Sequence, residues 1–91
     1  MSALGAATVP RLAAKARLQW DNVRARHVLL YPEGVVTLND TAAEILRMCD
    51  GDHAVRNIVA SLKLRYRAEG IERDVTTLLE GLAAKGLVTW Y

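Results

Sequence analysis

The first part of the chain alternates apolar and polar residues with a period of two. Residues 17–21 alternate in this way, and residues 27–31 and 35–38 are short runs rich in β-branched and aromatic side chains. Such runs are typical of half-buried strands. Tyr31-Pro32-Glu33-Gly34 separates the last two runs and has Pro and Gly at the second and fourth places of a β-turn. We therefore predict three antiparallel strands over residues 17–38.

After residue 38 the apolar residues recur with the spacing of amphipathic helices. The first predicted helix has a capping box at Thr41 and Glu44, with Asn39 or Asp40 as competing caps, and ends at Gly51. A second helix follows a cap at Asp52 and buries residues 55, 58, 59, 62 and 66. A third helix runs from about residue 72 to 85, and residues 87–91 form a short final strand.

These elements define the expected fold class and domain organisation. We predict an α+β fold, similar to a winged helix-turn-helix, with an N-terminal three-stranded antiparallel sheet followed by three helices and a short C-terminal strand. Residues 17–91 form this single domain, and residues 1–16 are predicted to be a flexible N-terminal tail. Winged helices bind DNA in some proteins and peptides in others, so the fold alone does not decide the function.

Composition restricts the function classes. A chain of 91 residues supports one core but no deep enclosed active site. The net charge of +2 is unevenly spread, because residues 1–31 hold five basic groups and one acid. A single cysteine excludes an internal disulfide and indicates a reducing compartment. No apolar run approaches the roughly 18 residues of a membrane span. We predict a cytoplasmic protein that does not bind membranes.

The residues that could carry chemistry do not form a constellation. His27 and His53 lie in different predicted elements, and Cys49 falls on an apolar helical face where a buried structural thiol is expected. Cys49 and His53 alone make a weak zinc site, and Asp50-Gly51-Asp52 lacks the later ligands of a calcium loop. We predict that the chain is not an enzyme and holds no metal or cofactor.

DNA binding remains the alternative function for such a fold. The third predicted helix would be the reading helix, yet its acidic residues outnumber its basic ones, and it has no Asn, Gln or central Arg for base edges. We therefore expect no nucleic-acid partner. The second helix carries a basic stripe of Arg56, Lys63 and Arg67. This stripe is either a solvated face or a docking surface for an acidic protein.

Two features favour peptide binding. In a small open sheet, the strand over residues 35–38 is a candidate for an unpaired edge, which can accept an extended segment by strand addition. The third helix also has small residues off its core face at Thr77, Gly81 and Ala84, with Arg73 and Glu80 nearby. A mid-helix glycine costs about 1 kcal/mol relative to alanine. Gly81 is explained either by the close approach of another chain or as a tolerated surface glycine. The open edge could instead serve a structural subunit that dimerises.

Several motifs occur in a defined order along the chain. They are Arg17-Leu18-Gln19-x-Asp21, residues 28–34 (Val-Leu-Leu-Tyr-Pro-Glu-Gly), Leu38-Asn39-x-Thr41-Ala42, Ile45-Leu46, Cys49-Asp50-Gly51 and Asp74-Val75. Together they resemble the PqqD-like peptide chaperones of pyrroloquinoline quinone (PQQ) biosynthesis, which are recognition elements for the leaders of ribosomally made, modified peptides. The resemblance runs from Arg17 to Val88. Residues 1–16 lie outside it.

The resemblance implies a function and a site. Members of that family bind the ribosomal precursor peptide and present it to a radical S-adenosylmethionine (radical SAM) enzyme, which joins a Glu and a Tyr of the peptide. Related domains take the peptide as an added strand between the third strand and the third helix. Mapped onto this chain, the strand side is Val35, Val36, Thr37 and Leu38. The helix side is Arg73, Thr76, Thr77, Glu80, Gly81 and Ala84. We expect a monomer, with a dimer possible through the sheet edge.

Overall fold

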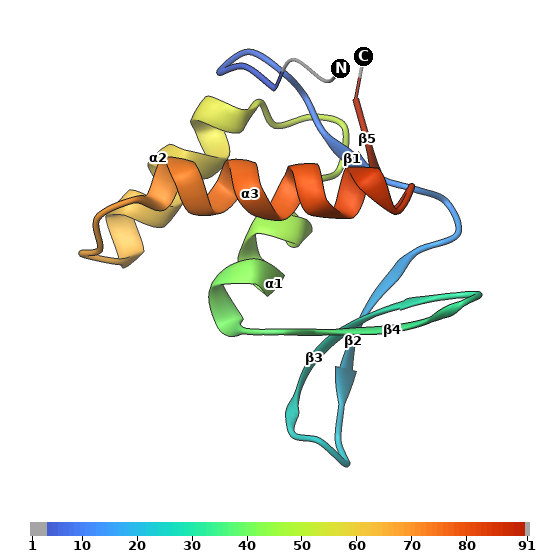
Figure 1. Cartoon of the computed structure of the whole chain (residues 1–91). Helices are drawn as coiled ribbons and strands as arrows, with labels where there is room; N and C mark the ends of the chain where they lie inside the picture. Colours follow the sequence, from blue (N-terminus) through green and yellow to red (C-terminus); the bar gives the residue numbers. More distant parts are fainter. Residues whose placement is uncertain (1–3, 91) are drawn as a thin grey trace.

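A computed structural model describes residues 4–90 and confirms the predicted α+β class (Figure 1). A meander of three strands is followed by three helices, and a short C-terminal strand pairs with a strand near the N-terminus. None of the helices within the described residues is long and apolar enough to cross a membrane. In chain order the elements are β1 (Arg11–Leu12), β2 (Arg17–Asp21), β3 (Arg26–Tyr31), β4 (Gly34–Leu38), α1 (Asp40–Arg47), α2 (Val55–Arg65), α3 (Ile71–Ala84) and β5 (Val88–Thr89).

The three-stranded sheet has the order β2-β3-β4, with both pairs antiparallel. Tyr31 pairs with Gly34 across a two-residue connection, which confirms the predicted turn. Leu29 on the central strand pairs with Leu18 on one side and Val36 on the other. Paired residues share a face of the sheet, so Leu18, Leu29 and Val36 lie on the face that carries the buried Leu29 into the core.

The first helix begins after one of the predicted caps, Asn39, but it ends earlier than predicted. Asn39 is its N-cap, since the side-chain oxygen of Asn39 accepts a hydrogen bond of 2.7 Å from the backbone N–H of Ala42. Thr41 is therefore inside the helix, and the predicted capping box at Thr41 and Glu44 is wrong. The helix ends at Arg47 with Met48 as C-cap, before the predicted stop at Gly51. Cys49 is buried but lies beyond the helix.

The cap of the second helix was also predicted wrongly. Ala54, and not Asp52, occupies the N-cap of α2, and it has no side-chain acceptor. The side chain of Asn57 accepts a hydrogen bond of 3.1 Å from the backbone N–H of Ala54. At the other end, Glu44 of α1 accepts hydrogen bonds from Arg65 and from the hydroxyl of Tyr66. These contacts join α1 to the C-terminal end of α2.

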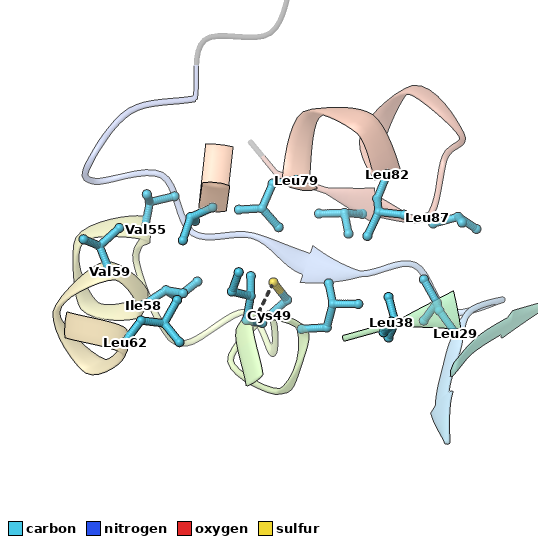
Figure 2. Packing of buried hydrophobic residues seen from close by; sticks show 14 of the residues in the cluster. Leu29, Leu38, Cys49, Val55, Ile58, Val59, Leu62, Leu79, Leu82 and Leu87 are labelled. Atoms are coloured by element: carbon cyan, nitrogen blue, oxygen red, sulfur yellow. Dashed lines mark hydrogen bonds between the residues drawn. The ribbon is translucent and has the colours of Figure 1, made fainter. Parts of the chain in front are cut away.

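The core lies between the inner face of the sheet and the three helices (Figure 2). Leu29 and Leu38 contribute from the sheet, and every predicted apolar position of α2 except Tyr66 is buried. On α3 the predicted Val75, Leu79 and Leu82 are buried, and Leu78 is half-buried. Gly86 follows α3 with a φ of 73°, as expected for its predicted role as the stop. The buried cluster comprises Leu29, Leu38, Ile45, Leu46, Cys49, Val55, Ile58, Val59, Leu62, Ile71, Val75, Leu79, Leu82, Leu87 and Val88.

The N-terminal segment is part of the fold, which corrects the predicted boundary at residue 17. Arg11 and Leu12 form β1 and pair with Thr89 and Val88 of β5. The carbonyl oxygens of Thr8 and Ala6 accept hydrogen bonds of 2.8 and 2.9 Å from the N–H groups of Val55 and Arg56. Two otherwise unsatisfied donors at the start of α2 are thereby capped by the backbone of a distant segment. Residues 4–16 therefore pack against the rest of the domain and are part of it.

Candidate binding groove

The β4 strand is a free edge of the sheet, as the sequence indicated. Tyr31 and Gly34 flank a two-residue turn and therefore form a hydrogen-bonded pair. Hydrogen-bonded and non-hydrogen-bonded pairs alternate along an antiparallel ladder, so Leu29–Val36 and His27–Leu38 are hydrogen-bonded pairs as well. The alternate residues, Val35 and Thr37, then direct their N–H and C=O groups away from β3. Both side chains are exposed. An extended chain that lies along this edge meets two donors and two acceptors.

A groove of about 430 Å³ lies where β4 passes into α1, facing α3. Ala42, Ile45 and Leu78 give it an apolar floor, and polar side chains form its rim. β4 ends at Leu38, and Asn39, the next residue of the chain, lines the groove. The lining residues are Asn39, Thr41, Ala42, Ile45, Asp74, Thr77 and Leu78.

Gly81 lies one helical turn beyond Thr77 and Leu78 along α3. It is exposed, and a Cβ built on it would meet no heavy atom within 4 Å. The fold itself therefore does not require glycine at this position. Arg73, Glu80 and Ala84 are also exposed on α3. These positions remain a predicted contact surface beside the groove.

For two residues of α3, the lining of the groove differs from the predicted helix side of the site. Thr76 lines a different hollow, which α3 forms with α2 and the N-terminal segment, so it does not face the groove. Asp74 lines the groove and was not among the predicted contacts. The signal for Asp74 was its spacing, because it lies three and four residues before Thr77 and Leu78 and so shares their face. Thr76 stays a predicted contact from the family resemblance, although it lines another hollow than the groove.

The three basic residues predicted for partner docking do not form one stripe. Arg56 and Lys63 lie on α2 and line the hollow beside α3, and the Nζ of Lys63 is 3.2 Å from the Oε2 of Glu72. Arg67 lies beyond Arg65, the last residue of α2, and does not line that hollow. Arg56 and Lys63 therefore belong together, and Arg67 is separate from them.

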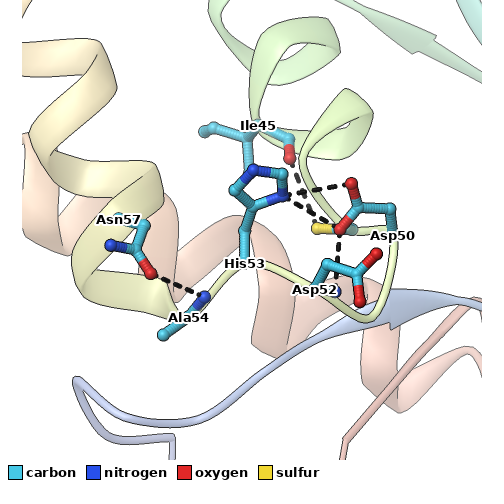
Figure 3. Close-up of polar contacts among 7 residues, drawn as sticks. Ile45, Asp50, Asp52, His53, Ala54 and Asn57 are labelled. Atoms are coloured by element: carbon cyan, nitrogen blue, oxygen red, sulfur yellow. Dashed lines mark hydrogen bonds and ion pairs between the residues drawn. The ribbon is translucent and has the colours of Figure 1, made fainter.

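The loop from Cys49 to His53 is held by local hydrogen bonds (Figure 3). The Cys49 thiol donates to the carbonyl of Ile45 at 3.3 Å, and burial raises the pKa of this thiol to about 12. The Asp50 carboxylate accepts from the N–H of Asp52 at 2.9 Å and lies 3.0 Å from the His53 ring. These bonds lower the pKa of Asp50, the Asp52 N–H contributing most. Local hydrogen bonds therefore account for the polar side chains of this loop.

Gly51 of this loop contacts the N-terminal segment. Its φ is 85°, and a Cβ built on it would lie 2.9 Å from the guanidinium of Arg11. The Gly51 N–H donates to the carbonyl of Pro10, and the N–H of Leu12 donates to the carbonyl of Cys49. Within residues 4–90 no three His, Cys, Asp or Glu side chains gather as metal ligands.

On α3 the charged residues that face solvent are mostly acidic. Glu72, Asp74 and Glu80 are exposed, against Arg73 alone within the helix. Such a surface repels phosphate, so this helix lacks the electrostatics of a DNA-reading helix. The groove beside it instead combines free backbone groups with an apolar floor, which suits an extended peptide.

Comparisons with known proteins agree with this geometry. The family model for coenzyme PQQ synthesis protein D (PqqD) matches residues 26–88. A Methylococcus capsulatus protein named PqqA binding protein is 44% identical over 81 residues, which cover 89% of this chain and 87% of the relative.

Two solved structures share the fold. One is the solution NMR structure of the PqqD truncation of Methylobacterium extorquens PqqCD, described as a functional and stand-alone recognition element for ribosomally synthesised, modified peptides. It has a TM-score of 0.81 at 39% identity and covers 96% of this chain and 95% of that chain. The other is lasso peptide synthetase B1 complexed with the leader peptide. It has a TM-score of 0.75 at 27% identity and covers 89% of this chain and 98% of that chain.

Proposed function

This chain belongs to the PqqD family, and from that premise we propose that it binds the ribosomal precursor peptide of PQQ as an added strand on β4. The observation that carries the proposal is the free edge of β4 beside the groove. Val35 and Thr37 offer outward N–H and C=O groups, and β4 is followed by Asn39, which lines a hollow with an apolar floor. The names of the relatives support the same ligand class, since one is a PqqA binding protein and another was solved with a leader peptide.

Strand addition gives each part of the site a distinct role. The backbone of Val35 and Thr37 supplies affinity for any extended chain, because main-chain hydrogen bonds do not depend on side-chain identity. Alternate side chains of an added strand point to the same side. Those that reach the floor formed by Ala42, Ile45 and Leu78 supply specificity. Gly81 leaves room for the peptide beside α3.

In this proposal the domain presents the peptide and does no chemistry itself. The partner enzyme is the radical SAM enzyme that joins a Glu and a Tyr of the precursor, and it docks on the basic residues Arg56 and Lys63 of α2. Both partners work in the cytoplasm, where the free thiol of Cys49 stays reduced.

A proline substitution on the edge tests strand addition. Thr37→Pro removes an N–H that points away from β3, and proline is tolerated at such edge positions. It leaves a carbonyl of the added strand unpaired, so we expect peptide affinity to fall about tenfold in isothermal titration calorimetry.

The matched control is Thr37→Val, which keeps both the backbone N–H and the β-branched shape. Its affinity should equal that of the wild type. Equal peptide affinity in all three proteins, with an intact amide spectrum for Thr37→Pro, would show that the peptide does not pair with β4.

A further inference from the structure

A second hollow lies on the other side of α3 and shares no residue with the groove. It has a volume of about 390 Å³ and is lined by the N-terminal segment, α2 and the first turns of α3. Val55, Val59 and Ala60 of α2 contribute apolar surface to it, and Leu4, Gly5 and Ala6 form a wall. We name this hollow the α2 pocket. Resting on the proposed function, we propose that it receives an apolar side chain, flanked by a carboxylate, from the enzyme that modifies the bound peptide.

The wall of the α2 pocket is fixed to the fold. The carbonyls of Thr8 and Ala6 accept hydrogen bonds from Val55 and Arg56, so the N-terminal segment is tied to the start of α2. Figure 1 shows this segment, in blue, passing close to α2. Leu4 packs against the buried cluster. A pre-formed apolar hollow of this kind is where a partner's anchoring side chain gains most of its binding energy.

The charges at the rim indicate the partner's chemistry. Arg56 is exposed at the edge of the α2 pocket and has no ion-pair partner among residues 4–90. Lys63 contacts Glu72 in an exposed pair, which contributes little to stability and can be exchanged for another carboxylate. An acidic residue next to the inserted side chain would therefore complement the rim and steer the encounter.

The place of the α2 pocket suits a domain that must hold two partners at once. Thr76 faces the α2 pocket, whereas the adjacent Thr77 faces the groove, so α3 separates the two sites. A peptide along β4 and a partner in the α2 pocket then bind without competing. Arg56 and Lys63 line the α2 pocket and Arg67 does not, so the docking role falls to Arg56 and Lys63.

Two substitutions test the assignment. Ala60→Phe fills the α2 pocket from an exposed position of α2, and Arg56→Glu reverses the charge at its rim. Each should lower the affinity of the full chain for the radical SAM enzyme by about tenfold or more. Peptide affinity, measured by calorimetry on the same preparations, should not change. Amide spectra would verify that both variants keep the fold.

The controls make the same changes elsewhere. Ala68→Phe places the same side chain on an exposed residue between α2 and α3, and Arg67→Glu reverses a charge that does not line the pocket. Both should bind the enzyme as the wild type does. The inference is overturned if Ala60→Phe and Arg56→Glu also bind normally, or if they lose peptide and enzyme together. It is equally overturned if Ala60→Phe alters the oligomeric state of the free chain in sedimentation, because a second copy would then be the occupant.

These outcomes are independent of the proposed function of the groove. If the wild type fails to bind the precursor peptide, strand addition is wrong. The comparison of enzyme affinities between pocket and control variants still decides whether the α2 pocket is a docking site.

Discussion

Gly81 is the residue of α3 whose identity the fold does not explain. Beyond the adjacent backbone of α3 itself, no heavy atom lies within 4 Å of the position that a Cβ would take, so alanine fits there without strain. We expect Gly81→Ala to raise the free energy of unfolding by about 1 kcal/mol, because alanine is the better helix former. Urea denaturation would measure this gain.

A larger side chain at the same place should obstruct the peptide. Gly81→Leu is expected to abolish most peptide binding in calorimetry while the fold persists. Glu72→Leu places the same side chain on the α2-facing side of the helix and should leave peptide affinity unchanged. If Gly81→Leu binds the peptide normally, α3 beyond Leu78 is not part of the site.

The buried thiol of Cys49 makes stability depend on alkaline pH. Burial raises the pKa of Cys49 from 9.0 to about 12, so the folded chain keeps a proton that the unfolded chain releases above about pH 9. The stabilisation from this group is complete below that pH and is lost as the pH rises towards 12, by up to ~1.4 kcal/mol per pH unit. Relative to Cys49→Ala, the wild type should lose urea resistance between pH 9 and 11. If the urea resistance of the two proteins changed with pH in the same way, the buried thiol would not be the cause.

Residue identities predicted some contacts better than others. Asn39 was one of three competing caps, and only the structure selects it, because each of the three side chains can accept from an N–H two or three residues further on. Asp74 was missed since an acidic residue in the first turn of a helix is explained by the helix dipole alone. The family resemblance placed Thr76 beside Thr77, but it could not show that the two residues line different hollows.

At the scale of elements, the N-terminal segment stabilises the fold, although no pattern in its sequence predicts this. It caps α2 with the carbonyls of Ala6 and Thr8 and pairs β1 with β5. Backbone carbonyls have no side-chain signature, and strands of two residues show no alternation. The longer strands β2, β3 and β4 were predicted within one residue because period and turn chemistry agreed.

Removal of residues 1–9 tests this role. Two backbone hydrogen bonds to α2 would be lost, each worth ~0.5–1.5 kcal/mol, and we expect a lower melting temperature by circular dichroism. Amide hydrogen exchange should accelerate at Val55 and Arg56 more than at Ile58, whose N–H donates within its own segment to Ala54. An unchanged melting temperature and unchanged exchange would mean that the segment does not cap the helix in solution.

At the scale of the whole molecule, the three-stranded sheet has two free edges, β2 and β4, and β4 is the one followed directly by a residue that lines the groove against α3, Asn39. In the proposed function, this combination makes β4 and not β2 the edge that takes the peptide. A dimer through β4 would use the outward groups of Val35 and Thr37 and would therefore compete with the peptide. The α2 pocket lies beyond α3 and stays open in either case.

The most direct test of strand addition on β4 is an amide NMR titration of the full chain with the PQQ precursor peptide. We expect large shifts at Val35 and Thr37 and along Asp74 to Gly81, together with nuclear Overhauser contacts between peptide amides and the β4 backbone. Shifts confined to Leu18 and Trp20 on the β2 edge, or no shifts at saturating peptide, would contradict it.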